Sequence, residues 1–279
     1  SGKRYLADIL SLFREHDYIT TAMMTKERGD ATAIVKELGA GMDKIVCIGG
    51  DGTFNETVCG VLEAGLTVPI GYIPAGSTND FANSLKLPKK MLTAAEAICI
   101  GTPHALDVGM LGERYFSYVA SFGAFTKASY STPQNVKNAL GHLAYILEGI
   151  KDIPSIRPLH VRFETEEKTI EDDYIFGAVS NSTSVGGVLT LNPDLVDMND
   201  GKFELLLIKA PNNVMELNNI VLALTTQDYT SPALTFCTTS KMTVTASPDM
   251  DWTVDGEWEQ GRTQFEVKNL HSAIQLILA

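Results

Sequence analysis

Residues 45–62 constrain the fold most, because they join an apolar run, a glycine-rich turn and a helical pattern. The run at 45–48 suits a strand buried on both faces. Three glycines within 49–52 predict a tight loop, since glycine adopts backbone angles that other residues resist. Apolar residues then recur at helical spacing, and Thr53 with Glu56 predicts a capping box at the helix start. This order directs backbone N–H groups toward one point, where a phosphate can bind.

A purely structural turn is the alternative interpretation of this glycine loop. The loop differs from a P-loop because no Lys-Ser/Thr pair follows the glycines, and from the dinucleotide fingerprint because the glycine spacing differs. It resembles the Gly-Gly-Asp-Gly-Thr motif of diacylglycerol kinases, sphingosine kinases, NAD kinases and, more loosely, phosphofructokinases, and its continuation is similar to the lipid kinase branch. On this resemblance the nucleotide-binding residues here are Gly49, Gly50, Asp51, Gly52, Thr53, Asn55 and Glu56.

A second loop follows the buried strand predicted at residues 70–73. Residues 74–82 read Pro-Ala-Gly-Ser-Thr-Asn-Asp-Phe-Ala, which places hydroxyl and amide groups beside free helix N–H groups. An elaborate helix cap is the alternative. The segment is similar to the Pro-x-Gly-Thr-x-Asn-Asp-Phe-Ala motif of diacylglycerol kinases, with a serine that keeps the hydroxyl where threonine is usual. The resemblance adds Gly76, Ser77, Asn79 and Asp80 to the expected nucleotide site.

The first half of the chain alternates strands and helices, which predicts a doubly wound parallel sheet with helices on both faces. Ligands of such sheets bind at the carboxyl ends of the strands. Asp30 is expected to cap a helix that ends at Gly39. Thr25 resembles the family threonine near the nucleotide, although a plain turn residue is the alternative. The other predicted helices are 3–14 and 91–100, and the other strands are 18–24 and 104–110.

The second half changes character after about residue 108. Many short strands with polar turns predict a β-sandwich. We therefore expect a nucleotide-binding α/β domain at 1–108 and a lipid-substrate β-sandwich at 109–270, with a tail at about 271–279 returning to the first domain. The predicted strands are 114–121, 159–165, 173–181, 203–209, 234–239, 241–245 and 263–268, with helices near 136–149 and 213–225. Residues 139–150 with Phe122 and Phe125 form core packing or the wall of an apolar groove.

Three aspartates cluster within residues 191–202, where carboxylates and carbonyls suit a hard cation such as Mg²⁺. A turn before a strand is the alternative. The segment resembles the family's Pro-Asp-Ala-x-x-x-Asp-Gly motif, which holds a structural Mg²⁺. On that match Asp200 supplies a side-chain ligand, and carbonyls near Asp197 and Lys202 complete the shell.

Residues 254–257 end in Asp-Gly-Glu, which taken alone is a common turn. The sequence resembles the Asp-Gly-Glu of diacylglycerol and sphingosine kinases, where a carboxylate takes the proton from the attacking hydroxyl. We favour Glu257 as the base and leave Asp255 open, either as the base, as the group that orients it, or as a partner in a catalytic Mg²⁺ network. The other members of that network would be Asp51, Asp80 and Asp107.

The net charge and the cysteine pattern limit the kinds of binding partner and the cellular compartment that we expect. The net charge of −12 argues against nucleic acid and against broad adhesion to an anionic membrane. The four cysteines lie in apolar segments without metal-ligand spacing, which indicates buried free thiols in a reducing compartment. Without a long apolar run or a signal peptide, the chain is expected to be cytoplasmic. The five histidines are expected to be structural.

The four motifs occur in family order and span nearly the whole chain. The resemblance implies an ATP- and Mg²⁺-dependent kinase that phosphorylates a lipid hydroxyl, with diacylglycerol giving phosphatidic acid as the favoured reaction. Such an enzyme would associate with a membrane surface peripherally and transiently. An NAD kinase-like small-molecule kinase and a non-catalytic nucleotide- or lipid-binding regulator remain as alternatives. A homodimer is one form the oligomeric state could take.

Overall fold

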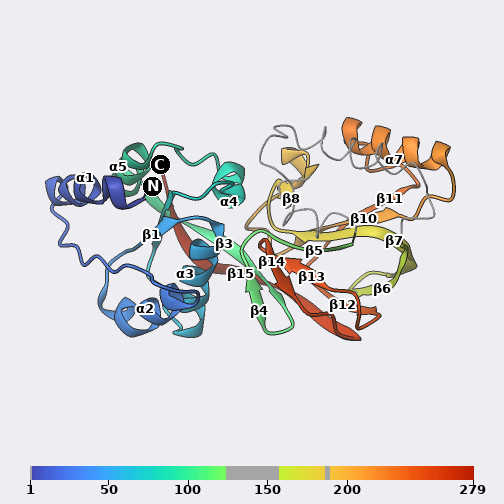
Figure 1. Cartoon of the computed structure of the whole chain (residues 1–279), viewed down its shortest axis with the longest axis horizontal. Helices are drawn as coiled ribbons and strands as arrows, with labels where there is room; N and C mark the ends of the chain where they lie inside the picture. The colour runs from blue at the N-terminus through green and yellow to red at the C-terminus, as the bar shows by residue number, and fades with distance from the viewer. Residues whose placement is uncertain (1, 124–156, 186–188) are drawn as a thin grey trace. The chain divides into compact units, whose positions relative to one another are not determined.

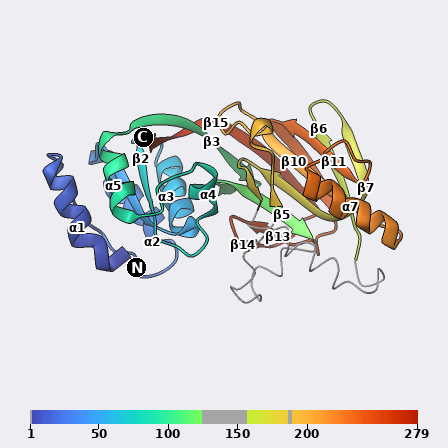
Figure 2. The ribbon, with the colours of Figure 1, turned by 90° about the horizontal axis from the view of Figure 1, so that it is seen from above.

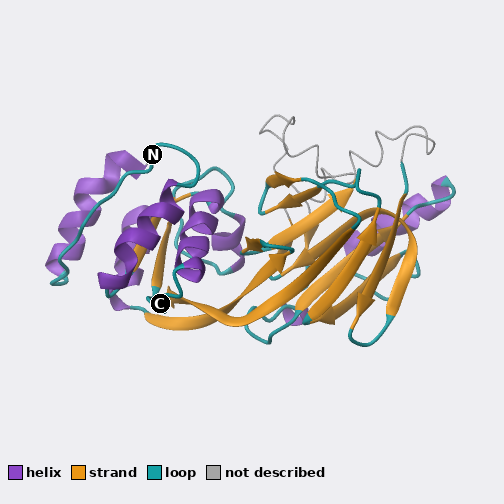
Figure 3. Ribbon diagram, turned by 90° about the horizontal axis from the view of Figure 1, so that it is seen from below, coloured by secondary structure: helices purple, strands orange, loops and turns teal. Residues whose placement is uncertain are grey.

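The computed structural model describes residues 2–123, 157–185 and 189–279 (Figure 1). It contains two compact units: unit 1 comprises residues 1–108 and 271–279, and unit 2 comprises 109–270. Helices surround the strands of unit 1, whereas strands make up most of unit 2 (Figure 3). Two long strands, β3 (Thr102–Leu111) and β15 (Gln264–Leu278), contribute residues to both units.

The sheet of unit 1 is parallel, as its alternating elements predict. Strand β1 (Ile45–Gly49) pairs with β2 (Ile70–Pro74) in register from Ile45↔Ile70 to Gly49↔Pro74. The end of β15 lies parallel to β2 on its other side, through Leu276↔Ile70. Strand β2 is buried along its whole length because it has a strand on each side and helices above and below.

One face of this sheet is covered by α1 (Gly2–Glu15) and α5 (Met91–Ile100), which Figure 2 shows on the same side of β2. Ile9 of α1 and Ile98 of α5 join Ile73 of β2 in one apolar cluster. Each of these side chains is almost completely buried. Burial of a side chain of this size contributes about 1.5–3 kcal/mol, so the cluster is a main source of stability in unit 1.

The opposite face is covered by α3 (Asp51–Glu63), on which α2 (Asp30–Leu38) packs. Phe54 of α3 stacks on Tyr72 of β2, with ring centroids 4.5 Å apart. Successive strand residues point to opposite faces, so Tyr72 contacts α3 while its neighbour packs against α1 and α5. Helices on both faces are therefore confirmed. The remaining helical elements are η1 (Gly39–Gly41) and α4 (Asp80–Ser84).

The strand predicted at residues 18–24 is wrong. This segment belongs to no strand and has no ladder partner among the described residues. Ile19 is 95% exposed, and Met23 and Met24 are also more than half exposed. Apolar composition does not make a strand without a neighbouring strand to accept its hydrogen bonds.

Unit 2 is a β-sandwich, as predicted. Its central strand β7 (Thr169–Ser180) pairs through its first half with β6 (Leu159–Thr165), and through its second half with β5 (Val119–Gly123) and β10 (Phe203–Lys209). The other elements are β4 (Arg114–Phe116), β8 (Ser184–Val185), β9 (Leu189–Thr190), η4 (Pro193–Leu195), α7 (Val214–Thr226), β11 (Leu234–Thr239), β12 (Lys241–Ala246), β13 (Trp252–Val254) and β14 (Glu257–Glu259). The helix predicted near 136–149 lies outside the described residues.

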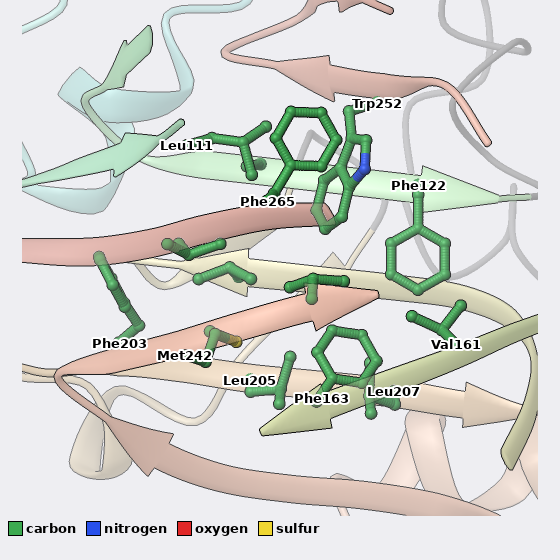
Figure 4. Close-up of a cluster of buried hydrophobic side chains, with 14 of the residues drawn as sticks. Leu111, Phe122, Val161, Phe163, Phe203, Leu205, Leu207, Met242, Trp252 and Phe265 are labelled. Atoms are coloured by element: carbon green, nitrogen blue, oxygen red, sulfur yellow. The ribbon is translucent and has the colours of Figure 1, made fainter. Parts of the chain in front are cut away.

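The core of unit 2 combines aromatic and aliphatic side chains, as Figure 4 shows. Phe122 lies with its ring centroid 5.0 Å from that of Trp252 and 6.2 Å from that of Phe163. It is fully buried in the sandwich, so core packing, and not the wall of an apolar groove, is the correct interpretation for Phe122. Phe125 and residues 139–150 lie outside the described part of the chain.

One predicted strand is interrupted. Residues 114–121 were expected to form a single strand, but β4 ends at Phe116 and β5 begins at Val119. The apolar pattern continues across the break, and the cause lies far along the chain, in the carboxylate of Asp255 described below. Helix α7 agrees with its prediction, and the side chain of Asn213 caps it by accepting from Glu216 N at 2.9 Å.

Candidate active site

The glycine loop leads directly into the N-terminus of α3. Helix α3 begins at Asp51 with Gly50 as its N-cap, and no side chain caps it. The predicted capping box is therefore wrong, because Thr53 already lies inside the first turn. Backbone N–H groups of a first helical turn have no acceptor within the helix, and the helix dipole makes this end positive. With Gly52 exposed, this end of α3 suits a phosphate group.

Glu56 points to a different helix from the one its spacing suggests. Its carboxylate accepts from Gly29 N at 2.8 Å and from Ala31 N at 3.2 Å, at the start of α2. Its carbonyl accepts from Thr32 Oγ1 at 2.8 Å. Glu56 therefore caps the neighbouring helix. In the preceding residue, Asn55 Oδ1 accepts from Cys59 Sγ at 3.6 Å along α3.

The turn before α2 also differs from its prediction. Asp30 is the first residue of α2, so it does not cap the helix, and Gly29 takes that position with φ 88°. The Asp30 carboxylate accepts from Lys26 N at 2.6 Å and Glu27 N at 3.1 Å, and these bonds lower its pKa. Thr25 lies exposed at the start of this turn. Hydrogen bonds to the carboxylates of Asp30 and Glu56 thus fix the backbone between Thr25 and the start of α2.

The two glycine loops meet at their backbones. Ala75 N donates to Gly49 O at 2.7 Å, which extends the pairing of β1 and β2. A Cβ added at Gly76 would lie 2.6 Å from the Cα of Gly50, and one added at Gly50 would lie 3.2 Å from the Cα of Gly76. At Gly76 no larger residue fits without moving backbone, so glycine is a steric requirement there, whereas a Cβ at Gly50 would need a shift of a few tenths of an ångström.

Asp51 joins the first loop to the second. Its carboxylate accepts from Asp80 N at 3.0 Å and Phe81 N at 3.3 Å, the first two residues of α4. Burial raises the pKa of Asp51, and the amide bonds oppose that rise. Asp51 therefore acts as a cap for α4. Asp80 itself is buried, with 8% of its surface exposed.

Asn79 fixes the second loop from within. Its Oδ1 accepts from Gly76 N and its Nδ2 donates to Gly76 O, both at 2.9 Å. Asn79 has a left-handed backbone with φ 53°, a conformation that asparagine tolerates better than most residues. Ser77 lies between these two residues and is exposed. In this loop, Asn79 fixes the backbone while Ser77 remains exposed.

Asp107 ties two strand segments of unit 1 together. It is 2% exposed, and its Oδ1 accepts from His271 Nδ1 at 2.9 Å and from Ser272 N at 2.7 Å. These contacts give Asp107 a structural role that its assignment to a metal did not foresee. The sequence signal was His271-Ser272, a polar pair just before the largely apolar end of β15, with Ser272 at φ 52°.

In unit 2, Asp255 and Gly256 form the two-residue turn between β13 and β14. Both have positive φ, 47° and 82°, as a type I′ hairpin turn requires. The Asp255 carboxylate accepts from Ser117 N at 2.6 Å, and from Tyr118 N and Val119 N at 3.1 Å each. Ser117 and Tyr118 form the break between β4 and β5, and Val119 begins β5. Asp255 is 6% exposed, so its carboxylate is engaged in holding this bend.

Glu257 lies in a more accessible position on the same hairpin. Arg114 Nη2 lies 2.6 Å from Glu257 Oε2, and Arg114 Nη1 lies 2.7 Å from Glu259 Oε2. The Glu257 side chain is 36% exposed. Trp258 lies between the two glutamates and is 57% exposed. Sequence reasoning missed Arg114 and Glu259, although the alternation Glu-Trp-Glu signals two glutamates on one face of a strand.

The acidic turn before β10 has the donors of a cation site. Asp197 Oδ1 accepts from Asn199 N at 3.0 Å, and Asp200 Oδ1 accepts from Lys202 N at 2.9 Å. Lys202 O accepts from Asn269 Nδ2 at 2.9 Å. Carboxylate and carbonyl oxygens are the ligands that Mg²⁺ and Ca²⁺ prefer. Within the described ranges, no three His, Cys, Asp or Glu side chains converge, so any cation here depends on backbone oxygens and water as well.

Glu204, two residues into β10, was missed by sequence reasoning. It is 1% exposed, and its Oε2 has no hydrogen-bond partner. Burial, with the carboxylates of Asp200 and Asp197 nearby, raises the pKa of Glu204 to about 8. This unpartnered buried oxygen supports the fit of a hard cation to the turn. A lone carboxylate in an apolar strand was the available signal.

Unit 1 therefore has the features of a phosphate-binding α/β domain, with glycine loops at the carboxyl ends of parallel strands, and unit 2 is a β-sandwich. The model for the diacylglycerol kinase catalytic domain matches residues 1–111, and the model for the YegS C-terminal NAD kinase beta sandwich-like domain matches residues 119–278. The chain belongs to the diacylglycerol kinase family.

Individual relatives agree with this assignment. A diacylglycerol kinase of Bacillus subtilis (strain 168) is 33% identical over 278 residues, covering 99% of this chain and 91% of that protein. One of Staphylococcus epidermidis is 30% identical over 276 residues, covering 98% and 86%. A solved structure of a diacylglycerol kinase from Bacillus anthracis str. Sterne has a TM-score of 0.71 at 19% identity, covering 92% of this chain and 84% of that one, which supports the shared fold.

Proposed function

We propose that this chain transfers the γ-phosphate of ATP to the hydroxyl of diacylglycerol and forms phosphatidic acid. The observation that carries the proposal is the backbone contact between Gly50 and Gly76 beside the uncapped start of α3. Membership of the diacylglycerol kinase family supports a lipid kinase. The lipid acceptor and the ATP donor belong to the proposal.

Unit 1 would hold the triphosphate through its backbone. The first-turn amides of α3 and the exposed Gly52 suit the phosphates, and Ser77 adds a hydroxyl donor from the second loop. Asp51 and Asn79 would keep the two loops at the required distance. Bound Mg²⁺ would supply charge neutralisation on the phosphates. Catalysis of phosphoryl transfer depends mainly on such positioning and neutralisation.

Unit 2 would supply the group that accepts the proton of the attacking hydroxyl. Glu257 suits this role better than Asp255, because the Asp255 carboxylate already accepts three backbone N–H groups and is buried. Arg114 would hold the side chain of Glu257 in one orientation. Asp255 would then act as a positioning residue that fixes the hairpin carrying Glu257.

The acceptor is a membrane lipid, so turnover requires transient contact with a bilayer surface. In the described residues, every helix is too short or too polar to span a bilayer. Sedimentation with diacylglycerol-containing vesicles would test this contact. We expect more protein in the pellet with these vesicles than without lipid, and no association at any lipid composition would contradict peripheral docking.

The reaction is tested by incubating the protein with radiolabelled ATP, Mg²⁺ and a panel of lipid alcohols, followed by separation of the products. We expect labelled phosphatidic acid from diacylglycerol. Gly76→Ala should lower kcat/KM by about 100-fold, because the added Cβ pushes the loops apart and misplaces the phosphates. Gly41→Ala is the matched control and should be neutral, since no atom lies within 4 Å of its added Cβ.

The other arms of the assay separate the alternatives. Label appearing on NAD and on no lipid would contradict the proposal in favour of an NAD kinase. ATP binding without transfer to any acceptor would contradict it in favour of a regulatory protein. Preference for another lipid alcohol would keep the lipid kinase and replace its substrate.

A further inference from the structure

One carboxylate in unit 2 is buried without an ionic partner. Glu204 lies on β10, a strand whose other residues between Phe203 and Ile208 are all apolar. It is 1% exposed. Among the described residues, no Lys, Arg or His side chain forms an ion pair with it. A buried carboxylate without compensation is strongly unfavourable, so a chain that keeps one has a reason for it.

The neighbouring strand β7 leaves one carboxylate oxygen of Glu204 unsatisfied. Residues paired directly across an antiparallel ladder lie on the same face, and Ser180 of β7 is the direct partner of Glu204. The Ser180 hydroxyl donates instead to Ser182 O, at 2.8 Å. Glu204 Oε2 consequently has no hydrogen-bond partner. Native structures rarely leave such an atom unpaired unless a water or an ion occupies the position.

The surroundings of Glu204 favour a cation over a water molecule. Asp200 lies in the acidic turn four residues before Glu204, and Asp197 lies in the same turn. A second unpartnered buried oxygen, Asn269 Oδ1, borders the same turn, and the amide nitrogen of that side chain donates to Lys202 O. Two unpaired buried oxygens beside a turn that carries the Asp200 carboxylate and backbone carbonyls have the donor chemistry of a hard divalent ion.

We propose that Glu204 is the buried anionic ligand of a divalent cation held by the turn at residues 197–202, either directly or through one bound water. Asp200 and backbone carbonyls would contact the ion from the turn, and Glu204 would approach it from the strand behind. A single divalent ion would balance the negative charges of Asp200 and Glu204. This inference rests on the magnesium site of the proposed function and extends it to a residue outside the motif.

Metal-stripped protein, without ATP or lipid, provides the test. Mg²⁺ is titrated while thermal unfolding is followed through fluorescence, and Mn²⁺ binding is counted by electron paramagnetic resonance. We expect Mg²⁺ to raise the melting temperature of the wild type by several degrees, as for any ligand specific to the folded state. Glu204→Gln should require at least about 10-fold more Mg²⁺ for the same shift, because it removes an anionic ligand. Asp249→Asn, an exposed carboxylate of the same unit, should match the wild type.

Two results would overturn the proposal: no response of the wild type to either ion, or equal midpoints for the wild type and Glu204→Gln. If the glutamine variant does not fold by circular dichroism, Glu204→Asp replaces it, since it keeps the charge on a shorter side chain. Weaker Mn²⁺ binding by Glu204→Asp supports the proposal, and unchanged binding contradicts it. Because no nucleotide or lipid is present, the result is independent of whether the chain phosphorylates diacylglycerol.

Discussion

The glycine loops of unit 1 and the hairpin of unit 2 are built by the same device. In each, an aspartate beside glycine accepts backbone N–H groups from a second segment of chain. Asp51 accepts from the first two residues of α4, and Asp255 accepts from the two residues between β4 and β5 and from the first residue of β5. Both carboxylates therefore fix one piece of backbone against another, as a helix cap does.

The two sites differ in the group beside the aspartate that can contact a ligand. Beside Asp51, the group left for a ligand is the backbone itself, the uncapped first turn of α3. Beside Asp255, it is the side chain of Glu257, which is held by Arg114 and partly exposed. The motif aspartates build the sites, and their neighbours are suited to the chemistry. Substitution should therefore affect stability at one residue and turnover at the next.

Glu257→Gln should give the largest effect. If Glu257 accepts the proton of the lipid hydroxyl, its amide lowers kcat by about 10²- to 10⁴-fold, the usual contribution of a general base. The free energy of unfolding should change by less than about 1 kcal/mol, because Glu257 is partly exposed and paired at the surface. Steady-state kinetics and urea unfolding measure the two quantities on the same sample.

Glu259→Gln is the matched control for this prediction. Glu259 lies on the same strand as Glu257 and also pairs with Arg114. The Glu259→Gln substitution therefore removes a comparable ion pair. It should retain kcat within about threefold, which is the range of a modest electrostatic change. Equal losses of kcat in both variants would assign the effect to the Arg114 cluster and remove Glu257 as the base.

Asp255→Asn should act on stability. The asparagine keeps one acceptor oxygen and brings an NH₂ group against backbone donors, so buried N–H groups lose their partner. We expect unit 2 to lose about 2–4 kcal/mol, the cost of breaking a buried charged hydrogen-bond group. Trp252 is buried in this unit, so its fluorescence in urea reports the loss.

Asp251→Asn on the same hairpin is the control for Asp255. Asp251 is only half-buried and accepts one backbone bond, from Gly261 N at 3.2 Å. Its loss should stay near 1 kcal/mol, the typical net value of a single hydrogen bond. Similar losses of unfolding free energy at both positions would mean that the three hydrogen bonds to Asp255 stabilise unit 2 no more than a single one does.

Glu56→Ala should give a smaller loss, confined to unit 1. Glu56 accepts from Gly29 N and Ala31 N at the start of α2, so its removal leaves that helix uncapped. Loss of a cap costs about 0.5–2 kcal/mol, and Glu56→Gln should recover part of it because its oxygen still accepts. Far-ultraviolet circular dichroism follows this unit, which contains most of the helices that the structure describes. Glu63→Gln, which removes a surface pair with Lys36, should cost less.

Glu56 also marks the limit of what the sequence predicts. The order strand, loop, helix was predictable because glycine spacing and apolar periodicity act over a few residues. The partner of Glu56 was not, because a Thr-x-x-Glu spacing satisfies the capping box whether or not the glutamate turns toward another helix. The break after Phe116 was equally hidden, because Asp255 causes it from a distant part of the chain.

Buried carboxylates account for the other differences between the sequence-based predictions and the structure. In the sequence, Asp107 and Glu204 are single carboxylates within predicted strands. Only the fold shows that His271 contacts Asp107 and that Glu204 Oε2 has no hydrogen-bond partner. The loop at residues 49–52 was predictable because its backbone conformation depends on glycines that are adjacent in the sequence. Long-range contacts of single carboxylates have no such local signal.

Asp51→Asn should give the smallest change in stability and the most informative dependence on pH. Burial is the largest influence on the pKa of Asp51 and raises it from 3.8. The folded state therefore binds this proton more tightly than the unfolded chain, and the stability contributed by Asp51 falls as pH rises from 3.8 through the raised pKa. At neutral pH the charge is already a penalty that its amide bonds offset, so its removal should cost less than about 1 kcal/mol.

The pH dependence separates this role from that of Asp255. The difference in unfolding free energy between wild type and Asp51→Asn, measured without Mg²⁺ or nucleotide, should be larger in mild acid than at neutral pH. The acid end is where protonated Asp51 still stabilises the wild type and asparagine has no proton to bind. A difference that grows toward neutral pH would mean that the bonds to Asp80 N and Phe81 N outweigh burial. Asp51 would then hold its loop as firmly as Asp255 holds the bend of unit 2.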